Sequence, residues 1–81
     1  MKISIEQTKV VYREAIDPMA SDGESASWWE EIMAEVKQVA CARTERDAEA
    51  VIAWWHHDWS LVSDTPAAAV RRIRRAVRAI K

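Results

Sequence analysis

Apolar residues recur three or four positions apart through most of the chain, which is the spacing of one face of an α-helix. Four such stretches predict helices over residues 5–16, 28–42, 45–62 and 66–80. The stretch 17–27 contains Pro18, Gly23 and three serines, and it interrupts the pattern. We expect it to be a mobile loop. The predicted fold is therefore all-α: a single domain, residues 1–81, built as a small bundle of about four short amphipathic helices.

Each predicted helix begins with a capping signal. Ser4, Ser27 and Thr44 each stand three positions before a Gln, Glu or Asp, as in a capping box. Thr65 precedes Pro66, which suits the first position of a helix because that position needs no backbone donor. A short strand over residues 2–5 is an alternative for the first signal, since apolar and polar residues alternate there.

The expected core faces follow from the same spacing. In the second helix, one apolar stripe opposes a polar face that includes Glu30, Glu31 and Glu35. The stripes of the second, third and fourth helices are Trp29, Ile32, Met33, Val36, Val39 and Ala40; Ala48, Val51, Ile52, Trp55, Trp59 and Val62; and Val70, Ile73, Ala76, Val77 and Ile80.

Composition narrows the class of protein. The chain has 81 residues, 49% of them hydrophobic and 31% charged, which is typical of one folded domain. It has one cysteine, Cys41, so no internal disulfide forms, and a reducing cytoplasm is the expected location. No apolar run approaches the ~20 residues of a membrane span, and the N-terminus lacks a signal-peptide pattern. We therefore expect no membrane partner.

Charge is divided unevenly along the chain. Residues 1–64 hold six Lys and Arg against thirteen Asp and Glu, a net of −7, whereas residues 65–81 hold six basic residues and no acid. Five of these six fan across one arc of the fourth predicted helix: Arg71, Arg72, Arg74, Arg75 and Arg78. One interpretation is a solvated face paired with the acidic remainder. The other is an anion-binding face for nucleic acid, although the overall pI of about 6.1 opposes it.

For two tryptophans the sequence allows more than one structural role. Trp54 projects away from the core face of the third predicted helix, on the side of His57 and Leu61. It is either buried in a central helix or an exposed anchor for a partner, because tryptophan is enriched at interface hot spots. Packing against a second copy of the chain, as a homodimer, is a further alternative. Trp28 either closes the loop before it or joins the partner contact.

The sequence predicts no chemistry of an enzyme. His56, His57 and Asp58 are adjacent, and adjacent helical positions point about 100° apart, so they cannot share one metal ion. Cys41 has no local base and is expected to be an inert, half-buried thiol. Glycine-rich phosphate loops and nucleophile motifs are missing from the sequence. We therefore predict no catalytic residues, no metal and no cofactor.

The function predicted from these features is a small non-enzymatic protein–protein interaction module. It would act as an inhibitor or adaptor that occupies a basic surface on its target, such as a nucleic-acid-binding protein. The predicted partner-binding residues are Trp54, His57, Leu61, Trp28, Glu30, Glu31 and Glu35. The alternative is a small nucleic-acid-binding protein that uses the arginines of the last helix. Small size, low glycine and split charge are also compatible with small phage or mobile-element inhibitors such as anti-CRISPR proteins.

Overall fold

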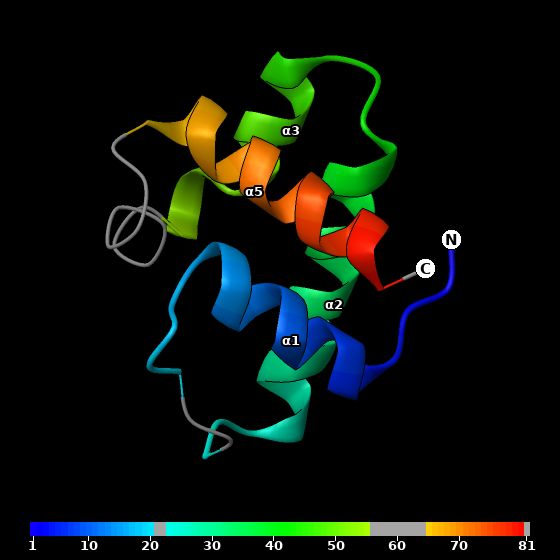
Figure 1. Cartoon of the computed structure of the whole chain (residues 1–81), viewed down its shortest axis with the longest axis vertical. Helices are drawn as coiled ribbons and strands as arrows, with labels where there is room; N and C mark the ends of the chain where they lie inside the picture. The colour runs from blue at the N-terminus through cyan, green and yellow to red at the C-terminus, as the bar shows by residue number, and fades with distance from the viewer. Residues whose placement is uncertain (21–22, 56–64, 81) are drawn as a thin grey trace.

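Four α-helices and one 3₁₀ turn form the regular structure of the described part of the chain. The computed structural model describes residues 1–20, 23–55 and 65–80. Its elements are α1 (Ile5–Ala15), α2 (Ala26–Cys41), α3 (Glu45–Val51), η1 (Ala53–Trp55) and α5 (Pro66–Ala79) (Figure 1). The predicted all-α fold is confirmed. The strand alternative for residues 2–5 is wrong, because residues 2–4 adopt no regular structure and Ile5 already belongs to α1.

Three of the four predicted caps are confirmed. The Ser4 hydroxyl accepts the backbone N–H of Gln7 at 3.1 Å, and the Gln7 side chain accepts the backbone N–H of Ser4 at 2.9 Å. The hydroxyl of Thr44 caps α3, and that of Thr65 caps α5 with Pro66 in its first turn. Each bond satisfies a backbone donor that a helix start leaves without an intrahelical acceptor.

The start of α2 differs from the prediction. Its N-cap is Ser25, whose hydroxyl accepts the backbone N–H of Trp28 at 3.2 Å, and the helix begins at Ala26. Ser27 lies in the first turn, with its hydroxyl 3.2 Å from that of Ser25. Ser27 fits the capping box, with Glu30 three positions on, whereas Ser25 has Trp28 there and caps the helix through its hydroxyl alone. The connection after α1 therefore ends at Ser25, two residues before the predicted limit.

The third predicted helix, 45–62, is shorter than the pattern suggested. α3 ends at Val51, because Ile52 has φ −96° and ψ 7° and leaves the helical path. The chain then tightens into η1, where the N–H of Trp55 donates to the carbonyl of Ile52 at 2.8 Å. The remainder of that prediction, with Trp59 and Val62, lies outside the described residues. The change of helix type decides how the two neighbouring tryptophans Trp54 and Trp55 are presented.

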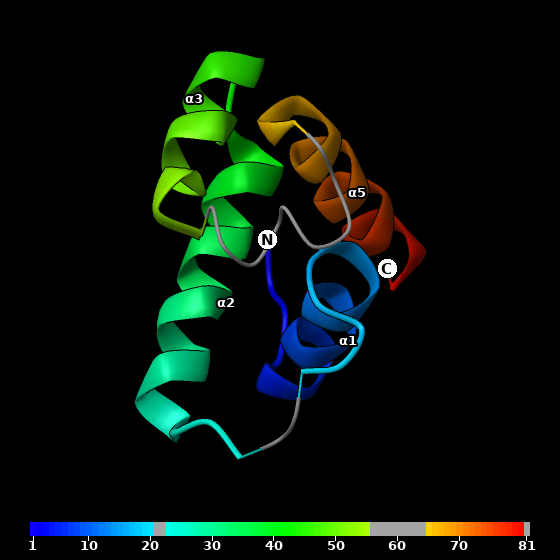
Figure 2. The same ribbon diagram turned by 90° about the vertical axis from the view of Figure 1, so that its left-hand side faces the viewer.

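The helices form two layers. Figure 2 shows α2 and α3 on one side and α1 and α5 on the other, with the N-terminal segment between them. α5 packs against α1, α2 and α3. The described residues span about 30 × 27 × 21 Å.

Each of the four α-helices and η1 contributes to the core. The predicted core positions Trp29 and Trp55 are confirmed, with 2% and 1% of their surface exposed. Val11 and Ile16 of the α1 region are also fully buried, and Ile3 of the N-terminal segment is a buried member of the same core. The spacing in the first predicted helix indicates a core face of Ile5, Thr8, Tyr12 and Ala15 or Ile16, which does not include Val11. The remaining large buried side chains are Tyr12, Ile32, Val36, Val39, Ile52, Val70, Ile73 and Val77.

Candidate protein-binding surface

Glu35 is buried, contrary to the prediction that it lies on the solvated face of α2. Only 8% of its surface is exposed. Position 35 lies about 40° from Val39 and about 60° from Ile32 around the helix axis, at the edge of the apolar face. A carboxylate at this edge is removed from water and needs hydrogen-bond donors from the protein.

Two indole groups supply these donors. The Nε1–H of Trp54 donates to Oε2 of Glu35 at 2.6 Å, and the Nε1–H of Trp55 donates to the same oxygen at 3.0 Å. The two rings meet edge to face, with centroids 6.0 Å apart and planes at 88°. One buried oxygen therefore fixes the orientation of both side chains.

The two tryptophans have opposite environments. Trp55 is buried in the core, where its ring also contacts that of Tyr12 edge to face at 6.0 Å. Trp54 keeps 55% of its surface exposed. Adjacent residues of a 3₁₀ turn point in different directions, so η1 buries one indole and leaves the other at the surface. The alternative in which Trp54 belongs to the core is therefore wrong for this chain as a monomer.

Burial and hydrogen bonding act in opposite directions on the pKa of the Glu35 carboxyl. Burial raises the pKa of the Glu35 carboxyl above its ordinary value, and the nearby carboxylate of Glu31 raises it further. The hydrogen bonds from Trp54 and Trp55 act in the other direction, because they stabilise the ionised form. Glu31 is exposed and lies one helical turn before Glu35 on the same face of α2. We call Trp54, Glu35 and Glu31 the Trp54 surface.

Of the other predicted partner-binding residues, Glu30 is exposed on α2 and points about 100° away from Glu31. His57 and Leu61 lie outside the described residues. The structure thus brings together Trp54, Glu35 and Glu31 and leaves Glu30 on another side of the helix.

Trp28 belongs to an aromatic cluster at the start of α2. Its ring meets that of Tyr12 edge to face at 5.5 Å and that of Trp29 at 4.9 Å. It is half-buried and packs against the core. Trp28 and Glu35 lie within about 20° of each other around the axis of α2, so both face the same side of the helix. This packing on α1 and the core agrees with the interpretation in which Trp28 closes the connection before α2, and a partner contact through its exposed part stays a prediction.

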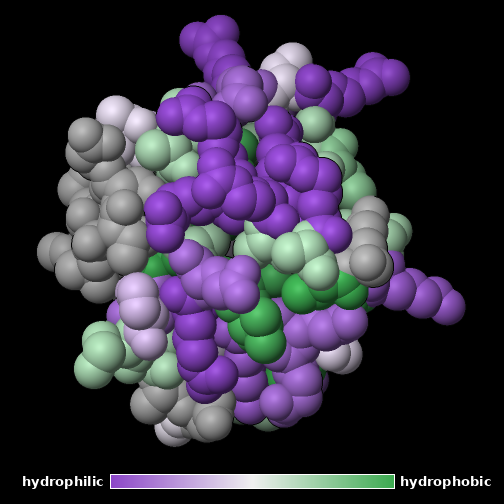
Figure 3. Space-filling model, viewed as in Figure 1, coloured by the Kyte–Doolittle hydropathy of each residue, from purple (hydrophilic) through white to green (hydrophobic). Residues whose placement is uncertain are grey.

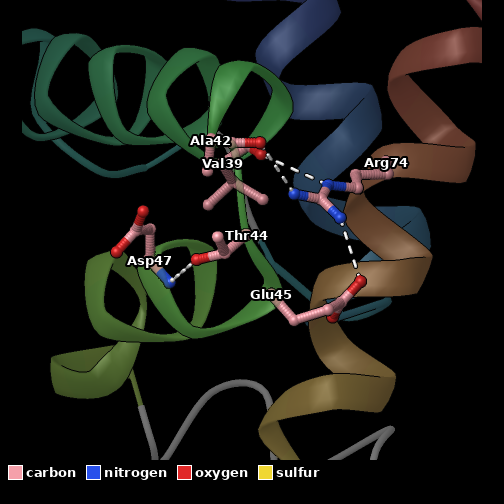
Figure 4. A network of polar contacts seen from close by, with 6 residues as sticks. All are labelled: Val39, Ala42, Thr44, Glu45, Asp47 and Arg74. Atoms are coloured by element: carbon pink, nitrogen blue, oxygen red, sulfur yellow. Dashed lines mark hydrogen bonds and ion pairs between the residues drawn. The ribbon is translucent and has the colours of Figure 1, made fainter.

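For the five arginines the sequence left two interpretations open, an anion-binding face or pairing with the acidic remainder, and Arg74 is paired within the protein. Its guanidinium donates to the carbonyls of Val39 and Ala42, each at 3.3 Å, at the C-terminal end of α2. It also forms an ion pair with Glu45 at 3.0 Å, at the start of α3 (Figure 4). Arg74 therefore connects the C-terminal end of α2 to the start of α3, and all three of its nitrogens are engaged in these contacts.

The other four arginines differ among themselves. Arg72 is half-buried and donates to the carbonyl of Glu14 at 3.2 Å, while its buried Nε has no hydrogen-bond partner among the described residues. It lines a cavity of about 230 Å³ together with Glu14, Arg75, Ala76 and Ala79. Arg71, Arg75 and Arg78 are exposed. Figure 3 shows hydrophilic side chains covering the region of α5 on this face. Of the five arginines in the predicted arc, three therefore remain exposed at the surface.

Cys41 is exposed, which corrects the expectation of a half-buried thiol. Among residues 1–20, 23–55 and 65–80, no group of His, Cys, Asp and Glu is arranged to hold a metal ion. The predicted His56–His57–Asp58 segment lies outside these ranges. No helix in the described part of the chain is long and apolar enough to cross a membrane.

Sequence reasoning missed the role of Glu35, although a signal for it exists. Indole N–H groups that become buried need acceptors, and Glu35 is the acidic residue of α2 closest to its apolar stripe. Trp29 shows the opposite outcome, because its buried Nε1 has no hydrogen-bond partner in the part of the chain that the structure describes. Comparisons with known proteins give no further guide: no family model, no curated protein and no solved structure matches the chain.

Proposed function

We propose that this chain is a small, non-enzymatic protein-binding module that uses Trp54 as its anchor. The observation that carries this proposal is the state of that side chain: 55% of its surface is exposed, yet its indole is fixed by a 2.6 Å hydrogen bond to Glu35. A large aromatic side chain held in one orientation loses little conformational entropy on binding. Tryptophan is also among the residues that contribute most to the affinity of protein interfaces.

The negative charge of α2 and α3 supports the proposal that the target presents a basic surface. The helices α2 and α3 carry six acidic and two basic residues, and among the described residues only Glu45 of these acids forms an ion pair. Such a surface accelerates association with positively charged proteins. A module of this kind would act as an inhibitor or adaptor by covering a basic site, such as the nucleic-acid-binding site of its target. The lone cysteine supports a cytoplasmic location.

The test is comparative capture from a lysate of the organism that encodes the chain. The unmodified protein, Trp54→Ala and the control Val10→Ala are immobilised in equal amounts, after each has been shown to be folded. Val10 is a matched control because it is an exposed apolar side chain on α1, 41% exposed, and makes no contact that the proposal uses. We expect a protein that the unmodified chain and Val10→Ala retain and Trp54→Ala loses. Equal retention by all three would refute the proposal.

Two alternatives have their own tests. Arg71, Arg75 and Arg78 are exposed along one stripe of α5, which supports the second candidate function, nucleic-acid binding. Replacing Arg71 and Arg75 with Ala should then weaken a gel shift at low salt, and no shift by the unmodified protein would exclude it. A homodimer through Trp54 would show a melting temperature that rises with protein concentration.

A further inference from the structure

The exposed face of Trp54 has the properties of a cation-binding ring. Among aromatic side chains, indole attracts cations most strongly over its face. The Trp54 indole also donates its Nε1–H to a carboxylate at 2.6 Å, which shifts electron density into the ring. In the described part of the chain, no cation lies over this ring, whereas Nζ of Lys9 lies 5.7 Å from the ring centre of Trp29. The molecule thus uses a cation–π contact at Trp29 and presents a second, more electron-rich indole at its surface.

One carboxylate binds this indole, and a second lies one turn earlier on the same face of α2. Glu35 uses Oε2 for both indole bonds, and none of the described residues donates to its Oε1. Glu31 is exposed one turn away and forms no ion pair with a described residue. The repulsion between Glu31 and Glu35 contributes to the raised pKa of Glu35, so a cation bound at the exposed Glu31 would relieve an existing cost.

The basic residues of α2 and α3 do not neutralise this site. Lys37 lies about 200° from Glu35 around the axis of α2. Arg46 belongs to the first turn of α3, at the end of that helix away from η1. A negatively charged partner such as nucleic acid or anionic lipid would be repelled here. The ligand that fits is a cation with a flat face for the indole and several donors for the carboxylates.

We propose that the Trp54 surface binds the guanidinium group of an arginine side chain presented by a basic partner protein. The planar guanidinium stacks on the indole, and its N–H groups bind the exposed carboxylate of Glu31, while the buried charge of Glu35 adds attraction from beneath the surface. Lysine fits less well, because its ammonium is a compact, strongly hydrated charge with no flat face. This inference rests on the proposed function and specifies the chemistry of the contact.

The experiment is a titration with the peptide acetyl-Arg₆-amide, followed by calorimetry and by the NMR signals of the indole N–H groups. Acetyl-Lys₆-amide has the same charge and serves as the ligand control. We expect the arginine peptide to bind more tightly and to shift the Trp54 indole signal more than that of Trp29. Trp54→Ala should weaken binding by at least about fivefold.

A pair of charge variants tests the geometry. Glu31→Gln and Glu30→Gln remove the same charge from adjacent exposed positions, but only Glu31 belongs to the Trp54 surface. Glu31→Gln should weaken binding of the arginine peptide clearly more than Glu30→Gln does. Equal losses in the two variants, or equal affinity for the two peptides, would overturn the inference, because diffuse negative charge would then explain the binding.

The outcomes also separate this inference from the proposed function. If Trp54→Ala loses a captured protein while the arginine peptide does not bind, the module stands and the guanidinium contact is refuted. If the peptide binds in a Trp54-dependent manner but no captured protein depends on Trp54, the contact chemistry is supported and the module function is refuted.

Discussion

Trp55 and Glu35 form a buried hydrogen bond of 3.0 Å between η1 and α2. The two residues are separated by 20 positions in sequence, and no pairing rule for helices connects them. Their bond joins the segment that follows α3 to the middle of α2. The exposed Trp54 shares the same acceptor oxygen, so the core and the candidate binding surface are coupled through one carboxylate.

Replacing Glu35 tests this coupling. Glu35→Ala leaves the buried Nε1–H of Trp55 without an acceptor, which should lower the free energy of unfolding by about 1–3 kcal/mol. Glu35→Gln keeps a carbonyl oxygen that is able to accept from both indoles, so its loss should be clearly smaller. Urea denaturation of the two variants measures the difference. Equal losses would mean that the indole bonds contribute little to stability.

The raised pKa of Glu35 predicts a defined pH dependence. Because the folded state binds this proton more tightly than the unfolded chain, ionisation of Glu35 costs stability. The unmodified protein should therefore lose stability relative to Glu35→Gln as pH rises from about 4.3, the ordinary value for Glu, through the raised pKa. Below that window both states are protonated and the difference is constant. Parallel denaturation of the two proteins between acidic and neutral pH measures it, and a difference that does not change would contradict the assignment.

Arg74 should be the most sensitive of the charged residues of α5. Arg74→Ala removes three hydrogen bonds at the junction of α2 and α3 and should cost about 1–3 kcal/mol. Arg78→Ala is the matched control, because Arg78 is exposed on the same helix, and its effect should stay within about 0.5 kcal/mol. Glu45→Gln should cost only about 0.2–1 kcal/mol, since that ion pair is partly exposed. Thermal and urea unfolding would rank the three variants.

The two neighbouring tryptophans should respond differently to truncation. Trp55→Ala opens a cavity in the core and should cost about 3–5 kcal/mol, enough to unfold so small a domain. Trp54→Ala removes a half-exposed ring and one hydrogen bond, and it should cost less than about 1.5 kcal/mol. Comparable destabilisation by both would show that Trp54 supports the fold and is a poor candidate for an anchor.

The sequence was sufficient to predict where a helix begins when its start depends on a local capping signal. Ser4, Thr44 and Thr65 cap their helices as predicted, because each hydroxyl bonds a backbone group three positions on. The capping-box rule failed at α2, because it selects Ser27, with Glu30 three positions on, whereas the helix is capped by Ser25, which has Trp28 at that position. Apolar spacing, in turn, did not predict the end of α3, because the apolar stripe continues in the sequence past Val51.

The candidate site was predicted only in part, because its decisive contacts are long-range. Periodicity identified Trp54 as a residue off the core face, and the structure leaves it exposed. Its bond to Glu35 spans 19 positions and depends on how η1 packs against α2. Arg74 was likewise assigned to a charged face, whereas its partners lie 29 to 35 positions away. Single-sequence patterns do not contain such pairings.

The position of α5 at the end of the described chain affects when the protein folds during synthesis. This helix contacts α1, α2 and α3, and it follows all of them in the chain. During synthesis, residues 1–64 leave the ribosome first, with a net charge of −7 and with the faces that α5 covers still open to water. The core is completed only when the basic helix emerges and docks. A nascent chain arrested before Thr65 should therefore remain a chaperone client, and the full domain should form in one late step.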